Sequence, residues 1–178
     1  RKIYLSAIEI DPEIAVSAAT ITWGNGITST AEWASSSAYS SVLQDWRGWV
    51  DEGILDLNLP MNYYREHVTS PDYPRAYRNW STFAKDHKYG RHLAIGPALY
   101  LNHIPGSVQQ MRHTREPTAL GNTAEGVVGY VYHQISIDDR SAGIFPLPFS
   151  EFRKAVTEPS EYDPVSPPMF AEEANVPE

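Results

Sequence analysis

The feature that most constrains the fold is a repeat of one strand and one helix along the chain. Apolar, β-branched stretches typical of strands begin near residues 15, 55, 92 and 126, and helical patterns follow at about 38–52, 73–89 and 106–116. Successive strands are therefore about 34 to 40 residues apart, which leaves room for one helix in each interval. Alternation of this kind predicts an α/β fold in which all strands run parallel.

Two arrangements of four such units fit the repeat: a small open sheet, and half of a TIM (β/α)8 barrel. Central strands of an open sheet are buried on both faces and favour continuous runs of Val, Ile and Leu. Two strands here instead alternate an apolar set with a small or polar set: Leu55, Leu57, Leu59 and Met61 against Asp56, Asn58 and Asn62, and Leu93, Ile95 and Leu99 against Ala94, Gly96 and Ala98. In a barrel the apolar set packs outward on the helices and the other set lines the narrow interior, so the alternation predicts half of a barrel.

The polar residues of the second strand have two possible roles. Asp56 and Asn58 fit structural hydrogen bonding inside a barrel as well as they fit a functional role. Asn62, at the strand's end, is the better functional candidate, because barrel sites form at the C-terminal ends of strands.

The two ends of the chain depart from the repeat. Residues 1–13 (RKIYLSAIEIDPE) start inside a helical pattern with no initiator Met or N-cap ahead of them, which we interpret as a truncated start. The repeat fades after Asp138, and the remainder is rich in proline. We therefore predict a partial barrel over residues 1–140 and an extended, Pro-rich C-terminal segment over 141–178.

Composition argues against several classes of protein. The net charge of −8 disfavours nucleic acid as a partner, because that binding needs clustered Lys and Arg. The sequence contains no apolar run of about 18 residues and no signal peptide, so no membrane span is expected. Cys is absent, which excludes disulfides and thiolate metal sites and leaves the compartment open.

Aromatic and amide residues recur where the predicted strands end. The four ends carry Trp23 and Asn25; Asn62, Tyr63, Tyr64, Arg65 and Glu66; Tyr100, Asn102 and His103; and Tyr130, Tyr132 and His133. Aromatic faces stack on the C–H surfaces of sugar rings and the polar groups hydrogen-bond hydroxyls, so the mixture suits a carbohydrate. The alternative is that each Tyr is an amphipathic rim residue with its hydroxyl in water. We expect six of them to gather at one end of the sheet: Trp23, Asn62, Tyr63, Tyr100, Asn102 and Tyr132.

Four segments carry a family resemblance: VSAATITWGNG, QDWRGWVDEGILDLNLPMNYYRE, FAKDHKYGRHLAIGPALYLN and GVVGYVYH. In this order and spacing they resemble the C-terminal half of the glycosyl-hydrolase-like 10 family of bacteria, over about residues 1–140 and most specifically at 46–63. The resemblance implies strands five to eight of a (β/α)8 barrel that acts on glycosidic bonds, and an extracellular or cell-envelope location. The family's N-terminal half, including an Asp-rich segment on strand four, has no counterpart in this sequence.

Glycoside hydrolysis generally uses two carboxyl groups that flank the scissile bond. Glu66 is the carboxylate that comes just after a strand's C-terminal end, which makes it the candidate acid/base, whereas an ion pair with Arg65 or His67 is the competing interpretation. The second carboxylate would come from the missing half. The candidate substrate-binding residues are Trp23, Asn62, Tyr63, Tyr100, Asn102, Tyr132 and His133.

No cofactor and no metal is expected. His103 and His133 both follow strand ends, but no carboxylates flank them, which favours a hydrogen-bonding role over metal ligation.

Three functions remain open. The chain is part of a glycoside hydrolase that is catalytic only with its N-terminal half, or a carbohydrate-binding module without chemistry, or an assembly component. The third follows from the open edges of a half-barrel, at residues 15–23 and 126–132, which invite pairing with another chain.

Overall fold

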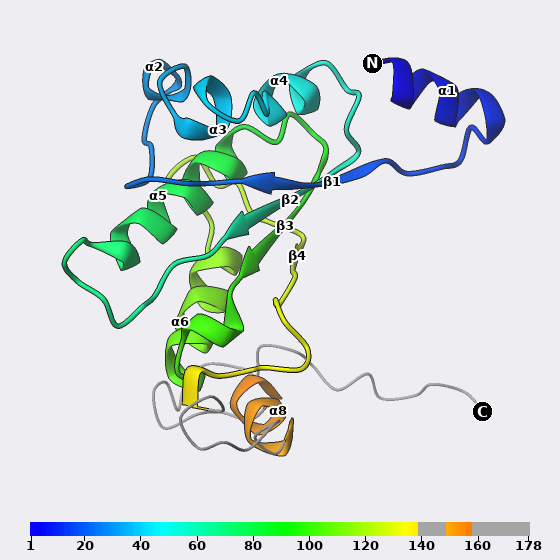
Figure 1. Cartoon of the computed structure of the whole chain (residues 1–178). Coiled ribbons are helices and arrows are strands. Elements are labelled where there is room, and N and C mark those ends of the chain that lie inside the picture. Colours follow the sequence, from blue (N-terminus) through cyan, green and yellow to red (C-terminus); the bar gives the residue numbers. More distant parts are fainter. Residues whose placement is uncertain (139–148, 158–178) are drawn as a thin grey trace, which may run out of the picture.

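The structure, a computed structural model, describes residues 1–138 and 149–157. Strands β1 (Ser17–Ile21), β2 (Leu57–Asn62), β3 (His92–Pro97) and β4 (Gly126–Val127) form one sheet in the order β1-β2-β3-β4. All three neighbouring pairs are parallel, as Figure 1 shows. The expected α/β fold of parallel strands that alternate with helices is confirmed.

The helices follow the predicted order but differ in extent. They are α1 (Lys2–Ile10), α2 (Thr30–Trp33), α3 (Ser37–Ser40), α4 (Trp46–Asp51), α5 (Tyr73–Asp86), the 3₁₀ turn η1 (Leu99–Leu101), α6 (Ile104–Arg115) and α8 (Phe149–Thr157). The continuous helix expected at 38–52 is wrong: Leu43 adopts a φ of 59° between α3 and α4, and the Asp45 carboxylate caps α4 by accepting from the Gly48 amide. Among the described helices, none is long and apolar enough to span a bilayer.

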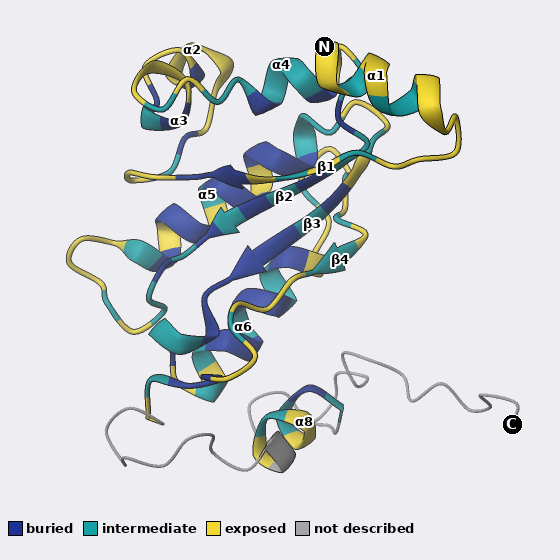
Figure 2. Cartoon of the chain, turned by 45° about the vertical axis from the view of Figure 1, so that its right-hand side comes forward, coloured by how far each residue is buried: buried dark blue, intermediate teal, exposed yellow. Residues whose placement is uncertain are grey.

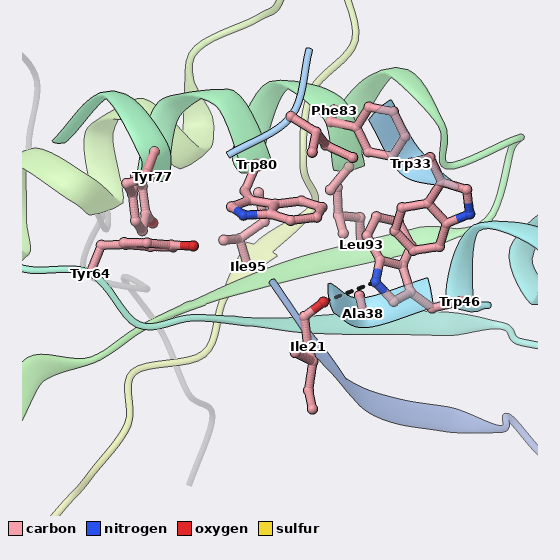
Figure 3. Close-up of a cluster of buried hydrophobic side chains, with 13 residues drawn as sticks. Ile21, Trp33, Ala38, Trp46, Tyr64, Tyr77, Trp80, Phe83, Leu93 and Ile95 are labelled. Atoms are coloured by element: carbon pink, nitrogen blue, oxygen red, sulfur yellow. Dashed lines mark hydrogen bonds between the residues drawn. The ribbon is translucent and has the colours of Figure 1, made fainter. Parts of the chain in front are cut away.

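An aromatic core joins the helices to one face of the sheet (Figure 3). Trp33, Trp46, Trp80 and Phe83 come from α2, α4 and α5 and pack with centroid separations of 4.6 to 6.5 Å. The Trp46 indole also donates to the Ile21 carbonyl of β1 at 3.1 Å. Because each buried side chain of this size contributes about 2–3 kcal/mol, the cluster fixes α2, α4 and α5 on the same side of the sheet.

The predicted assignment of faces is right for β3 and wrong for β2. Leu93 and Ile95 point to the helices as expected. In β2 the buried parity is Asn58, Pro60 and Asn62, while Leu57 and Leu59 are only half-buried. The two amides can be buried in the helix layer because both make hydrogen bonds. The Asn58 amide oxygen accepts from the Thr20 hydroxyl at 2.7 Å, and the bonds of Asn62 are described below.

The opposite face of the sheet carries mostly small and apolar side chains. The pairing register places these residues on it: Ser17, Ala19, Ile21, Leu57, Leu59, Met61, His92, Ala94 and Gly96. In Figure 2, α5 and α6 lie behind the sheet, and no described helix covers β2 and β3 in front. The sheet is thus covered by helices on one face only, within residues 1–138 and 149–157.

The C-terminal segment contains a helix that the sequence analysis did not predict. Residues 149–157 form α8, and Phe152, Ala155 and Val156 contact the cluster around Leu99, Val108, Met111 and Ile135. The apolar residues recur at spacings of three and four in a stretch without proline, a pattern that the proline content on either side concealed. The extended interpretation is wrong for these nine residues, and the rest of 141–178 lies outside the described part of the chain.

Candidate functional site

Three tyrosines meet beyond the C-terminal ends of β2, β3 and β4. The Tyr63 ring stacks on Tyr130 with centroids 5.4 Å apart, and Tyr100 approaches both rings edge-on at 6.4 and 6.0 Å. Partial burial, together with the neighbouring phenols of Tyr130 and Tyr100, raises the pKa of Tyr63 to about 12. The Tyr63 hydroxyl is therefore a neutral hydrogen-bond donor at any physiological pH.

Tyr130 takes the place that the sequence analysis gave to Tyr132. The strand predicted at 126–133 ends at Val127, and Tyr130 rejoins the sheet only through a single bridge to Ala98. Tyr132 lies beyond this bridge and is 80% exposed. Alternation along a full strand would have put both tyrosines on one side, so the early end of β4 explains why only Tyr130 reaches Tyr63.

A pocket of about 340 Å³ opens beside this cluster, at the ends of β1 and β2. Its lining consists of Thr22, Trp23, Gly24, Asn25, Met61, Tyr63, Tyr64, Arg65, Pro71 and Tyr73. Trp23 is 58% exposed at the rim, so its indole face is available to a ligand. Two of the predicted substrate-binding residues, Trp23 and Tyr63, thus share one pocket.

Tyr64 holds the two loops that form this pocket together. Its buried hydroxyl shares its proton between the carbonyl oxygens of Thr22 and Gly24, which follow β1. Burial raises the pKa of Tyr64 well above its ordinary value, so the hydroxyl keeps the proton that these bonds need. Tyr64 therefore fixes the shape of the pocket before a ligand binds, and binding does not have to pay the entropic cost of ordering this side chain.

Asn62 is buried among helix residues and does not line the pocket. Its amide nitrogen donates to the Tyr77 carbonyl at 3.0 Å and to the Ser81 hydroxyl at 2.9 Å, both on α5. Its amide oxygen accepts from the Thr22 hydroxyl at 3.1 Å. With these groups engaged and the side chain inaccessible to solvent, Asn62 positions the strand ends rather than contacting a ligand.

Asn102 positions the loop that carries Glu66. Its amide oxygen accepts from the Glu66 backbone N–H at 2.6 Å, and its nitrogen donates to the carbonyls of Tyr64 and Ala98 at 2.9 and 3.0 Å. Gly106 makes this approach possible, because a Cβ there would lie 3.1 Å from Glu66 Cβ. Asn102 is fully buried, so its role is again to position neighbouring residues.

The Glu66 carboxylate lies against α6, outside the pocket lining. It is half-buried and accepts from the Gln110 side-chain amide at 3.2 Å. No ion pair with Arg65 or His67 is formed in the described part of the molecule, in contrast to the alternative weighed from the sequence. The lining of the pocket therefore contains aromatic rings, amide and guanidinium groups but no carboxylate.

His67, His103 and His133 do not gather into one cluster in the described part of the chain. The His103 ring bonds to Asp138 at 2.9 Å and lies 5.1 Å from the ring of His67, while His133 is exposed elsewhere on the surface. The hydrogen bond from His103 lowers the pKa of Asp138, with the Ser136 hydroxyl adding to the effect. Within residues 1–138 and 149–157, no group of three His, Asp or Glu side chains is placed to hold a metal.

Tyr130, Arg65 and Tyr73 belong to this site but were not among the substrate-binding residues chosen from the sequence. Tyr130 and Arg65 were noted only as members of the strand-end clusters, with Arg65 also weighed as an ion-pair partner for Glu66, and the placement of Arg65 in the pocket depends on the path of the chain after Asn62. Comparison of the sequence with models of known protein families and with curated proteins finds no match.

Proposed function

We propose that this chain is the C-terminal half of a (β/α)8 barrel of the glycoside-hydrolase-like type and binds a carbohydrate at the C-terminal edge of its sheet. One observation carries the proposal: Trp23 and Tyr63 line one pocket beyond the ends of parallel strands, and Tyr100 and Tyr130 pack against Tyr63 beside it. Parallel α/β folds form their sites at this edge, and aromatic faces with hydroxyl and amide donors suit a sugar ring.

The one-sided sheet supports the barrel part of the proposal. A doubly wound sheet carries helices on both faces, whereas barrel strands carry helices outside and small or branched side chains inside. Here the helices α2, α4, α5 and α6 lie on one face, and Ala19, Ala94 and Gly96 are on the other. Four further strands that pair with β1 and β4 would close the sheet and cover this second face.

Hydrolysis is proposed only for the completed barrel. Glu66 is the candidate acid/base, since it follows β2 and is held by Gln110 at the same edge. The second carboxyl group, which hydrolysis needs at about 5 to 10 Å, would come from the missing strands. Binding without chemistry is the second candidate, favoured by the absence of any carboxylate from the pocket lining.

Calorimetric titration of the chain with a panel of oligosaccharides tests the binding proposal. We expect Trp23→Ala and Tyr63→Ala each to weaken binding about tenfold or more, because stacked aromatic rings contribute of the order of 1–2 kcal/mol. Tyr89→Ala is the matched control, since Tyr89 is a similarly exposed tyrosine that precedes β3 at the opposite edge of the sheet. Equal affinities for all three variants would refute the proposed site.

Aryl glycosides distinguish the enzyme from the binding module. Turnover by the chain together with a polypeptide that supplies the other strands, lost in Glu66→Gln, would support hydrolysis. Sugar binding with no turnover in that assembly would support the binding module. Light scattering addresses the assembly role, because pairing through the β1 and β4 edges gives a species larger than the monomer.

A further inference from the structure

Arg65 stands out among the pocket residues because its charge has no counterpart. The side chain is half-buried, and within residues 1–138 and 149–157 its guanidinium makes no ion pair and no hydrogen bond. By contrast, Arg1, Arg75 and Arg91 each pair with a carboxylate. A guanidinium presents five donors, and none of those of Arg65 is among the buried unpartnered atoms of the described residues, so solvent reaches them and they are available to a ligand.

The charge around Arg65 strengthens this reasoning. The chain carries a net charge of −8, yet no Asp or Glu lines the pocket, and Arg65 is the only Lys or Arg among the lining residues. The neighbouring carboxylate along the chain, Glu66, accepts from Gln110 on α6 instead of Arg65. An acidic protein therefore keeps one positive group in this pocket, an arrangement that selects a negatively charged ligand and repels a positively charged one.

The aromatic walls indicate what kind of anion fits. Trp23, Tyr63 and Tyr73 line the same pocket as Arg65 and provide flat apolar faces. A ligand that uses both features has a ring for the aromatic faces and an anionic group within reach of the guanidinium. The planar fork of Arg matches the two oxygens of a carboxylate.

We propose that this pocket binds a uronic acid residue, with the Arg65 guanidinium holding the sugar carboxylate and the ring lying against Trp23 and Tyr63. This inference rests on the proposed carbohydrate function and adds the class of sugar. The anionic group gives the selectivity, and the aromatic surface gives contact area at low entropic cost.

Titration with matched pairs of sugars tests the inference. Oligosaccharides of galacturonic, glucuronic, mannuronic and guluronic acid are each compared with their methyl esters, which keep the ring and linkage but lack the charge. At least one acid is expected to bind about ten- to a hundredfold more tightly than its ester, because a hydrogen-bonded charge pair contributes that factor. The ratio of acid affinity to ester affinity should decrease as salt is raised from 50 to 200 mM, since screening weakens the attraction between the guanidinium and the carboxylate.

Two variants distinguish the effect of the Arg65 charge in the pocket from the effect of the overall electrostatic field of the protein. Arg65→Gln is expected to abolish the preference for the acid, so that this variant binds the acid and its ester with equal affinity. Arg78→Gln, which removes the same charge from an exposed position on α5 outside the pocket, is expected to preserve it. The comparison of acid with ester on the unmodified chain needs no variant, so a folding defect in Arg65→Gln does not remove the test.

The outcomes of this experiment are distinct. Equal binding of acids and esters would overturn the inference and leave the carbohydrate function standing. The same loss of preference in Arg65→Gln and Arg78→Gln would also overturn it, because a long-range field would then be responsible. Failure of every sugar, charged or neutral, to bind would overturn the proposed function itself.

Discussion

Replacing Asn62 with alanine removes three hydrogen bonds from the junction of β1, β2 and α5. The bonds are those to the Tyr77 carbonyl, the Ser81 hydroxyl and the Thr22 hydroxyl. At about 1 kcal/mol each, their loss destabilises the fold by about 2–3 kcal/mol, since the Thr22 hydroxyl keeps the Met61 carbonyl as an acceptor, and this is a large part of the 5–15 kcal/mol typical of a domain. Ser81 is only 2% exposed, so water does not replace its lost partner without rearrangement.

Urea denaturation measures this loss. With a slope of about 2 kcal/mol per M, the midpoint of Asn62→Ala is expected to fall by about 1 to 2 M. The control is Asn25→Ala, an exposed amide at the pocket, for which a change below about 0.5 kcal/mol is expected. In a double-mutant cycle, Asn62→Ala and Ser81→Ala should be non-additive by at least about 0.5 kcal/mol. An unchanged midpoint, with sugar affinity lost in the folded variant, would refute our account and return Asn62 to the substrate site.

Three further predictions concern single groups. The pKa of Tyr63 is raised from 10.0 to about 12, so the contribution of its protonated hydroxyl to stability is complete below pH 10 and is lost as the pH rises from 10 to 12. The free energy of unfolding of Tyr63→Phe should therefore fall less steeply with pH over this window than that of the unmodified chain. Equal slopes would contradict the assignment. Lys85, 3% exposed on α5, donates to the His113 and Glu116 carbonyls at the end of α6. Lys85→Met should therefore lower the free energy of unfolding by about 1–3 kcal/mol. An unchanged melting curve would contradict this prediction and would show that the cost of desolvating the charge cancels these bonds. Asn102→Ala should speed hydrogen exchange at the Glu66 amide by about tenfold, measured by NMR, and equal exchange would mean that Asn102 does not hold the loop.

The sequence was sufficient for the parallel sheet because strand and helix patterns repeat over long intervals. It was insufficient where orientation depends on tertiary partners. Asn62 has the composition of a ligand-binding residue, but the Tyr77 carbonyl and the Ser81 hydroxyl on α5 draw its amide into the helix layer. Amide side chains can occupy the buried face of a strand when they find hydrogen-bond partners there. The alternation of residues in β2 does not show whether such partners exist.

The site was predicted in kind but not in every member. Of the residues chosen for their place after strand ends, Trp23 and Tyr63 share a pocket and Tyr100 contacts Tyr63, whereas Tyr132 and His133 do not join them. Tyr130 replaced Tyr132 because β4 ends after two residues, which depends on its pairing with β3 and not on local propensity. The placement of Arg65 in the pocket follows from the loop after β2, whose path is set by Asn102 and Tyr64.

Acrylamide quenching of tryptophan fluorescence tests the central claim, that a carbohydrate binds against Trp23 at this edge of the sheet. Of the five tryptophans, Trp23 is 58% exposed, Trp33, Trp46 and Trp80 are at most 3% exposed, and Trp49 is half-buried. Acrylamide is neutral, so it does not compete for Arg65. The account predicts that an oligosaccharide which binds the chain lowers the quenchable fraction, and that Trp23→Phe, which should still bind it, shows no such decrease. Binding of the sugar with no protection of Trp23 would contradict the account.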